Sequence, residues 1–329
     1  MKLFLSHAGV SEVAGGVERY AQYLSEVFPS TKHLDYHSHK KEFGDGFSLL
    51  REPIRAKKLG GFVSKNYSNV NTIFTNGMFC WNLKEKNQIN ICHGTYAAFA
   101  EKALSKTNPD YFRLKYIYSY FEKKAAKNAS KVIVNSKSTA QSVKKYFGLS
   151  SEVIYPPVDF ENFKPMDFEK ARENLGWAGV NVLFVGRAEK AKGFDLVESV
   201  AEKNPNISFK CILSRHYNSK VKNIEIISPK KHALLPLYYN AADLVLFPSR
   251  FEGFGFVTIE ALACNKKIVT LGAGIASEIE SENLFVTIES ELNKTLRIAL
   301  SNQNSNSRNL MKNVFSVKKF REKWRSACE

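Results

Sequence analysis

Two carboxylates bracket a glycine-containing turn in the second half of the chain. Residues 251–260 read Phe-Glu-Gly-Phe-Gly-Phe-Val-Thr-Ile-Glu and place Glu252 and Glu260 eight positions apart. The apolar run 244–249 before the turn is typical of a buried parallel strand, and residues 258–264 after it predict a helix. Open α/β sheets bind their ligands at this kind of junction, outside the carboxyl end of a strand.

The turn offers two kinds of ligand group. Its glycines let the main-chain amides of Gly253, Phe254 and Gly255 approach a ligand closely, and a helix start adds a partial positive charge that suits phosphate. Glu252 and Glu260 can accept hydrogen bonds from neutral hydroxyls. Donors for phosphate together with acceptors for hydroxyls indicate a sugar nucleotide.

Two basic residues occupy a similar junction earlier in the chain. Arg187 and Lys192 lie between a predicted strand at 181–186 and a predicted helix at 194–203. Arginine offers a bidentate fork to phosphate oxygens and lysine a point charge, so the two could neutralise a diphosphate leaving group without a metal. The alternative is a pair of exposed basic residues.

Two further candidates lie in the first half. Gly15 and Gly16 follow the predicted strand 2–6 and could bring amides against a phosphate or a sugar, although an ordinary strand-to-helix turn has the same pattern. His93 ends a predicted strand just before Gly94, where it would face a cleft or serve as a structural histidine. No Gly-x-Gly-x-x-Gly fingerprint occurs, which argues against a nicotinamide or flavin enzyme.

Short apolar strands alternate with helical stretches along the whole chain, which predicts parallel sheets covered by helices on both faces. We expect strands at 2–6, 71–76, 89–93, 131–136, 181–186, 207–213, 224–228, 243–248, 267–271 and 284–287. We expect helices at 16–28, 110–128, 139–147, 194–203, 234–241, 258–264, 290–300 and 317–326, with a capping box at 138–141. The proline-containing stretch 155–165 predicts a linker between two domains.

Composition narrows the class of protein. The chain has 329 residues, enough for two domains, and five scattered cysteines without a Cys-x-x-Cys pair. We therefore expect a reducing compartment, no disulfide frame and no zinc or other metal site. No apolar run of about eighteen residues predicts a transmembrane helix, and the start is too short for a signal peptide. These features favour a cytoplasmic location.

The net charge of +16 is unevenly distributed: residues 1–150 hold 23 Lys/Arg and 11 Asp/Glu, and the remainder holds 25 and 21. A basic first half suggests an anionic partner such as a membrane surface, a phosphorylated acceptor or nucleic acid. Two stretches, 49–65 and 110–131, mix apolar or aromatic residues with Lys and Arg and could lie peripherally on anionic lipid. The alternative is a pair of core helices with solvated basic faces.

Taken together, these motifs resemble the GT-B glycosyltransferases, in particular glycosyltransferase family 4 (glycosyl transferases group 1). The matching pieces appear in the family's order and span nearly the whole chain. They are Gly15-Gly16, His93-Gly94, 134–138, 155–159, Val185-Gly186-Arg187 with Lys192-Gly193, and Glu252-Gly253-Phe254-Gly255 with Glu260.

The resemblance implies an α/β GT-B fold, with two Rossmann-like doubly wound domains facing each other across a cleft. Residues 1–157 would bind the acceptor, 158–313 would bind the nucleotide sugar, and a helix within 314–329 would pack back on the first domain. It further implies a retaining, metal-independent transfer that needs no cofactor beyond the nucleoside-diphosphate sugar as co-substrate. The acceptor would be a glycan, glycolipid or lipid-linked molecule in surface polysaccharide or lipopolysaccharide biosynthesis. The basic stretches described above would place the protein peripherally on the inner face of the cytoplasmic membrane.

By the same resemblance, Arg187 and Lys192 would hold the diphosphate and Glu260 the ribose. Glu252 and the amides of 253–255 would hold the sugar and phosphate. His93 would line the donor-sugar pocket, and Gly16 would lie near the diphosphate. The chain departs from the pattern at Ser214-Arg215-His216, where many relatives have a Gly-x-Gly turn.

Two other functions remain open at this stage. Another GT-B sugar-nucleotide enzyme, such as an epimerase, would share the donor motifs. A polyanion-binding protein without enzymatic activity would account for the charge, but it leaves the Glu252–Glu260 pattern unexplained. No fold signature or aromatic platform for nucleic acid is present, so nucleic acid is not an expected partner.

Overall fold

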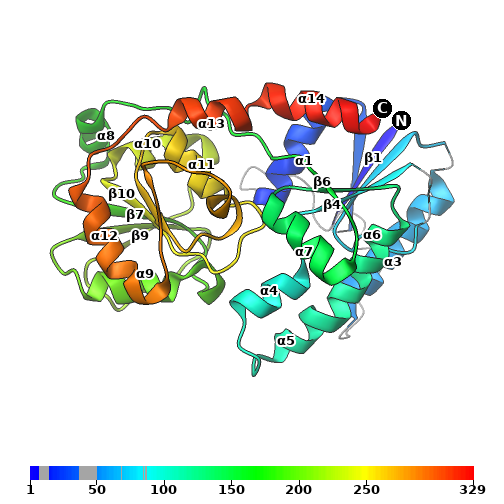
Figure 1. The fold of residues 1–329 in the computed structure, drawn as a ribbon, viewed down its shortest axis with the longest axis horizontal. Coiled ribbons are helices and arrows are strands. Elements are labelled where there is room, and N and C mark those ends of the chain that lie inside the picture. Colours follow the sequence, from blue (N-terminus) through cyan, green and yellow to red (C-terminus); the bar gives the residue numbers. More distant parts are fainter. Residues whose placement is uncertain (7–14, 37–49, 68, 84, 86) are drawn as a thin grey trace. The chain divides into compact units, whose positions relative to one another are not determined.

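The computed structural model describes residues 1–6, 15–36, 50–67, 69–83, 85 and 87–329, and it divides into two compact units (Figure 1). Unit 1 comprises Met1–Pro156 and Phe320–Glu329, and unit 2 comprises Pro157–Lys319. Residues 13–14 before the Gly15-Gly16 turn, and Leu49 at the start of the first basic stretch, lie outside the described residues.

Unit 1 is built, in its described part, on a six-stranded sheet of order β2-β1-β3-β4-β5-β6 in which all neighbours are parallel. The strands are β1 (Lys2–Ser6), β2 (Thr31–Asp35), β3 (Thr72–Asn76), β4 (Gln88–Cys92), β5 (Lys131–Val134) and β6 (Glu152–Val153). Successive side chains enter different cores: Leu3 and Leu5 share one cluster, while Phe4 belongs to another. This alternation shows a sheet that is buried on both faces.

Helices cover this sheet. They are α1 (Gly16–Val27), α3 (Arg51–Asn66), α4 (Tyr96–Ala103), α5 (Pro109–Phe112), the π-helix η1 (Arg113–Tyr118), α6 (Ser119–Asn128) and α7 (Lys137–Phe147). The last helix, α14 (Val317–Cys328), packs on unit 1 from Phe320 onward. Its Trp324 is fully buried and donates from Nε1 to the Tyr20 hydroxyl at 3.2 Å, and that hydroxyl donates to the Ile154 carbonyl at 3.3 Å.

Unit 2 has its own parallel six-stranded sheet, with the order β12-β11-β10-β7-β8-β9 among the residues described. The strands are β7 (Asn181–Gly186), β8 (Ser208–Leu213), β9 (Ile224–Ile227), β10 (Leu244–Phe247), β11 (Ile268–Thr270) and β12 (Leu284–Val286). The helices are α8 (Phe168–Leu175), α9 (Phe194–Glu202), α10 (Leu235–Ala241), α11 (Phe256–Ala263), α12 (Leu292–Ser301) and α13 (Arg308–Phe315), with 3₁₀ turns η2 (Lys190–Lys192), η3 (His232–Leu234), η4 (Gly274–Ser277) and η5 (Glu289–Glu291). In Figure 1, α9 and α12 cover one side of this sheet and α10 and α11 the other.

The predicted α/β class, with two doubly wound parallel sheets, is confirmed. Two short strands, β2 and β6, and the helices α3, α4, α8 and α13 lie outside the predicted elements. The capping box expected at 138–141 is wrong: Ser136 adopts extended geometry and its Oγ accepts from the Thr139 amide at 2.9 Å, so α7 begins at Lys137. No helix among the described residues is long and apolar enough to cross a membrane.

The two basic stretches differ in where their apolar residues point. Within 49–65, α3 buries five residues that include Ala56, Leu59 and Val63 in a unit 1 core. The first stretch is therefore a core helix, as the alternative interpretation expected, although only Lys57 and Lys65 among its basic residues are exposed. In the second stretch, by contrast, several aromatic side chains stay exposed.

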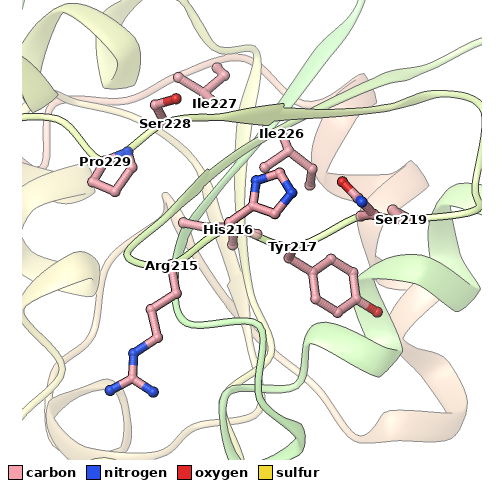
Figure 2. A pocket seen from close by; sticks show the side chains of 10 residues that line it. Arg215, His216, Tyr217, Ser219, Ile226, Ile227, Ser228 and Pro229 are labelled. Atoms are coloured by element: carbon pink, nitrogen blue, oxygen red, sulfur yellow. The ribbon is translucent and has the colours of Figure 1, made fainter.

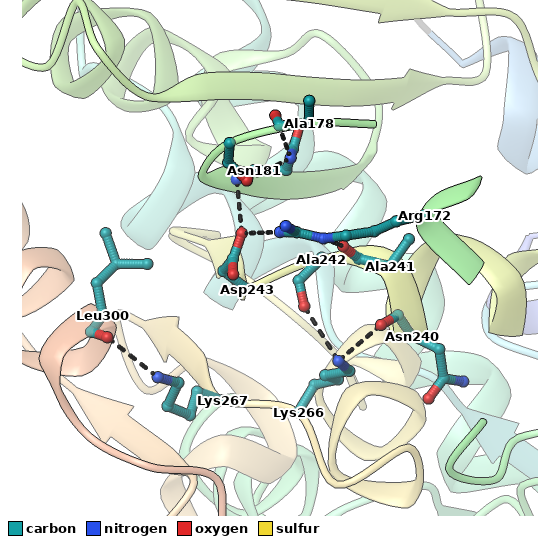
Figure 3. Close-up of polar contacts among 11 residues, drawn as sticks. Arg172, Ala178, Asn181, Asn240, Ala241, Ala242, Asp243, Lys266, Lys267 and Leu300 are labelled. Atoms are coloured by element: carbon teal, nitrogen blue, oxygen red, sulfur yellow. Dashed lines mark hydrogen bonds and ion pairs between the residues drawn. The ribbon is translucent and has the colours of Figure 1, made fainter. Parts of the chain in front are cut away.

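Buried polar groups secure the amino ends of the unit 2 strands (Figure 3). The Asp243 carboxylate accepts from the Asn181 amide at 2.7 Å and pairs with the Arg172 guanidinium. Lys266 is 5% exposed and donates to the carbonyls of Asn240 at 2.7 Å and Ala242 at 3.1 Å. Burial lowers the pKa of Lys266 from 10.5 to about 8, because the surroundings disfavour the charged amine.

This lysine predicts a pH-dependent stability difference. Between about pH 8 and 10.5 the folded protein releases the Lys266 proton while the unfolded chain keeps it, so deprotonation favours the folded state. Relative to Lys266→Met, the wild type should gain up to about 3 kcal/mol in free energy of unfolding across this window. Urea unfolding at pH 7 and pH 10.5 measures the difference. The exposed Lys294→Met serves as control, and an equal pH response in Lys266→Met and the wild type would contradict the assignment.

Candidate functional site

The sheet order of unit 2 places the candidate residues side by side. Because its strands are parallel, the loops that follow β10, β7, β8 and β9 emerge in that order along one edge. These loops carry, respectively, Glu252, then Arg187 with Lys192, then Arg215, then Ser228. Residues far apart in sequence are thereby brought to one carboxyl edge, where open α/β sheets bind ligands.

The loop after β7 is docked on the segment after β10. The Arg250 amide donates to the Ala191 carbonyl at 3.0 Å. Gly193 has a φ of +71°, and a Cβ added to it would lie 2.0 Å from the Pro248 carbonyl oxygen. Only glycine combines this backbone conformation with so close an approach, so Gly193 fixes where the preceding lysine stands.

Lys192 and Glu252 form an ion pair as a result of this docking. The lysine Nζ lies 2.6 Å from the glutamate Oε1, with the two side chains 21% and 9% exposed. A partly desolvated pair of this kind holds an ammonium group at the sheet edge. An incoming phosphate could share the lysine's remaining donors, since an ammonium group carries three.

Arg187 lies at the same edge but outside this pair. Its side chain is 52% exposed, and its nearest acid is Glu189, at 3.4 Å from Nη1. The guanidinium therefore keeps solvent-facing donors that a diphosphate could use. Glu189 was not singled out from the sequence, because nothing in its spacing separates it from a solvated surface residue.

Helix α11 begins at the glycine-containing turn, with Gly255 as its N-cap residue. Phe254 is 3% exposed, and its ring packs against Phe256 and Phe315, so its side chain belongs to the core. Thr258, in the first turn, is fully buried, and its Oγ1 has no hydrogen-bond partner among the described residues. A buried hydroxyl without a partner is uncommon in a folded protein.

The Glu260 carboxylate is 1% exposed and already hydrogen-bonded. Tyr239 donates to its Oε2 at 2.9 Å, and His232 Nε2 lies 2.8 Å from its Oε1. His232 is one-third exposed, so it is the member of this cluster that faces solvent. Neither partner stands out in the sequence. They lie 28 and 21 positions before Glu260, and only the tertiary fold joins them.

A cavity of about 380 Å³ opens beyond the ends of β8 and β9 (Figure 2). It is lined by Leu213, Arg215, His216, Tyr217, Asn218, Ser219, Ile226, Ile227, Ser228 and Pro229. Arg215 and His216, which replace the Gly-x-Gly turn of many relatives, are thus wall residues of this cavity. Bulky polar side chains therefore stand where the family pattern has glycine.

The remaining candidates belong to unit 1. His93 follows β4, and burial lowers its pKa to about 4, so its imidazole is neutral near pH 7. Its Nε2 is buried without a hydrogen-bond partner in the described residues, and its ring meets the edge of Tyr20 at 4.8 Å. Gly15 is the N-cap residue of α1 and Gly16 begins the helix, with a Glu18 oxygen 2.9 Å from where a Gly15 Cβ would lie.

Comparisons with known proteins agree with this arrangement. Residues 167–314 match the family described as Glycosyl transferases group 1, and residues 48–162 match Glycosyltransferase Family 4. The D-inositol 3-phosphate glycosyltransferase of Mycobacterium tuberculosis strain H37Rv is 29% identical over 174 residues, which cover 46% of this chain. The match spans only 36% of that relative's own length.

Solved structures show the same fold at low identity. Sucrose-phosphate synthase from Thermosynechococcus elongatus superposes with a TM-score of 0.80 and 16% identity, covering 99% of this chain and 98% of that one. The Anabaena protein HepE, solved in complex with UDP and glucose, superposes with a TM-score of 0.75 and 18% sequence identity, and the match covers 99% of each chain. The fold and the two matched regions assign this chain to the class of GT-B glycosyltransferases. The chain belongs to glycosyltransferase family 4.

The close approach at Gly193 yields a prediction. Gly193→Ala should lower the free energy of unfolding by at least about 2 kcal/mol and abolish stabilisation by a nucleotide sugar, because the loop that carries Lys192 must move away from Pro248. Gly179→Ala is the matched control, since Gly179 has a φ of +67° but nothing within 4 Å of an added Cβ. The control should cost about 1 kcal/mol and leave donor binding intact. Equal behaviour of the two variants in thermal unfolding with and without donor would contradict the docking argument.

Proposed function

We propose that this protein transfers a sugar from a nucleoside-diphosphate sugar to a glycan, glycolipid or lipid-linked acceptor. The observation that carries the proposal is the order of groups along the carboxyl edge of the unit 2 sheet. Glu252 comes first, the cations Lys192 and Arg187 follow, and the cavity beside Arg215 comes last. A nucleotide sugar has the same order of parts: sugar, diphosphate and nucleoside.

Each part of the donor meets suitable chemistry. Glu252 and the amides of the 253–255 turn would hold sugar hydroxyls and the adjoining phosphate. Lys192 and Arg187 would hold the diphosphate. The cavity would take the base, and Glu260, which the family resemblance assigns to the ribose, is hydrogen-bonded to His232 at 2.8 Å. The complex of HepE with UDP and glucose supports a UDP-sugar as the first donor to test.

The proposed step breaks the bond between the anomeric carbon and the phosphate oxygen, and the nucleoside diphosphate leaves with the bonding electrons. Preorganised cations at Lys192 and Arg187, together with the amides at the start of α11, would stabilise the developing negative charge. An acceptor hydroxyl would attack from the side of the leaving phosphate and pass its proton to that phosphate oxygen. This course retains the anomeric configuration. His93, as a neutral imidazole, is proposed to hydrogen-bond a sugar hydroxyl, as the family resemblance implies.

The charges of Lys192 and Arg187 are proposed to make a divalent metal unnecessary. The proposed setting is the inner face of the cytoplasmic membrane, in the synthesis of surface polysaccharide, lipopolysaccharide or related glycoconjugates. The basic balance of residues 1–150 supports an anionic surface or a phosphorylated acceptor.

A ligand screen tests the donor. Thermal unfolding of the purified protein is measured with UDP-, GDP-, dTDP- and ADP-sugars at millimolar concentration, with and without a chelator. We expect stabilisation by one nucleotide family, unchanged by the chelator and lost in Lys192→Met, which keeps the length of the side chain but not its charge. No stabilisation by any donor, or stabilisation that the chelator removes, would contradict the proposal.

The orphaned hydroxyl of Thr258 gives a sharper test. Thr258→Val keeps the side-chain shape, so the free protein should be as stable as the wild type or slightly more stable. If the hydroxyl donates to the bound phosphate, KM for the donor should rise roughly tenfold. Thr295→Val is the matched control, because the Thr295 hydroxyl is satisfied by Thr287 at 2.8 Å. It should lose stability with KM unchanged, and a Thr258→Val variant with the wild-type KM would remove Thr258 from the donor site.

A further inference from the structure

Unit 1 exposes a row of aromatic side chains on one continuous helical segment. Phe112, Tyr116 and Tyr120 are 63%, 53% and 59% exposed and recur every four residues through α5, η1 and α6. The rings of Phe112 and Tyr116 pack against each other at a centroid distance of 5.0 Å. We call these three residues the aromatic stripe. Large side chains exposed in a contiguous row mark an interaction surface more often than scattered single ones do.

The π-helix η1 keeps the stripe in line. In a regular α-helix, residues four apart drift by about 40° around the axis at each step. The wider i→i+5 turn of η1, which lies between Phe112 and Tyr120, offsets this drift. The unusual backbone therefore presents three rings on one face.

The opposite face of the same segment is held firmly in the unit. Tyr118, Ser119 and Ala125 are buried, and Glu122, at 4% exposure, accepts from the Tyr96 amide at 2.8 Å. This hydrogen bond ties α6 to the start of α4. Because the buried face satisfies the packing of the helix, the exposed rings are not needed to stabilise unit 1.

The surroundings of the stripe are strongly basic. Residues 96–147 contain eleven Lys/Arg and three Asp/Glu. Those three acids are all engaged: Glu122 is buried, Asp110 pairs with Arg113 at 2.7 Å, and Glu101 pairs with both Lys115 and Lys145, at 3.1 and 2.9 Å. In α6, Lys123 and Lys127 follow Tyr120 by three and seven residues. This spacing places both lysines on the same face of the helix as Tyr120.

We propose that the aromatic stripe is the surface by which unit 1 docks on an anionic lipid bilayer. Phenylalanine and tyrosine rings partition into the membrane interface, while the neighbouring lysines attract acidic headgroups. A protein partner would be expected to contact a surface of mixed charge, whereas the acids around the stripe are already buried or ion-paired. The inference deepens the proposed function, since it places the enzyme where a lipid-linked acceptor is found, but binding to vesicles does not depend on donor binding.

Co-sedimentation with vesicles tests the surface. The full chain is mixed with phosphatidylcholine vesicles with and without 30% phosphatidylglycerol, at low and at physiological salt. Each lysine removed from the surface should weaken binding to the anionic vesicles roughly fivefold. We expect binding to the anionic vesicles only. The triple variant Phe112→Ser, Tyr116→Ser, Tyr120→Ser should lower the partition coefficient at least about tenfold, and Lys123→Gln with Lys127→Gln should lower it and flatten its salt dependence.

Matched controls separate the possible outcomes. Ile298→Ser, Leu310→Ser, Val314→Ser removes three exposed apolar side chains of unit 2, with exposures of 47%, 51% and 42%, and should leave vesicle binding unchanged. Stabilisation by the nucleotide sugar against thermal unfolding should be equal in all variants. A loss of donor binding would thus be distinguished from a loss of vesicle binding. Equal partitioning of the wild type and the stripe variant would overturn the proposal. So would a dimer in sedimentation equilibrium that the stripe variant abolishes, because the stripe would then bind a second copy.

Discussion

The carbonyl of Pro248 occupies the space in which a side chain at position 193 would begin, and the arrangement of the unit 2 edge follows from that contact. The loop after β7 can lie flat on the segment after β10 only because glycine adopts the left-handed conformation there. With the loop in place, the Lys192 amine stands 2.6 Å from Glu252. A cation is thereby fixed beside a carboxylate and a helix start, a combination that suits a phosphorylated sugar.

Both edges of the unit 2 sheet are polar, but they differ in the kind of group that is available to a ligand. At the amino edge, Asp243 and Lys266 have partners within the protein and tie α8, α10 and the strand ends together. At the carboxyl edge, the Thr258 hydroxyl lacks a partner in the described chain, and the Arg187 side chain is half exposed. The buried atom without a partner at the amino edge, Asn181 Oδ1, is an acceptor, whereas the Thr258 hydroxyl and the Arg187 guanidinium at the carboxyl edge can donate to an anion. The stable edge positions the strands, and the other edge is left free to bind.

The sequence predicts regular elements well and tertiary partners poorly. Apolar runs locate β1 and β7 to the residue, because buried parallel strands read as continuous hydrophobic segments. The Ser136 cap was misplaced by two residues, since Ser138 offers the same chemistry and only the backbone conformation decides between them. The partners of Glu260 could not be found from spacing, because His232 and Tyr239 reach it across the fold. The π-turn in η1 likewise has no sequence signature that periodicity detects.

A crystal structure of the protein with a bound nucleoside diphosphate would test the central claim most directly, namely that the carboxyl edge of β10, β7, β8 and β9 binds the donor in the order sugar, diphosphate and base. The account predicts phosphate oxygens within hydrogen-bonding distance of Lys192 and Arg187, and the base in the cavity that Arg215 and His216 line. A nucleotide bound elsewhere in unit 2, or one whose base and phosphates lie in the reverse order along this edge, would contradict it.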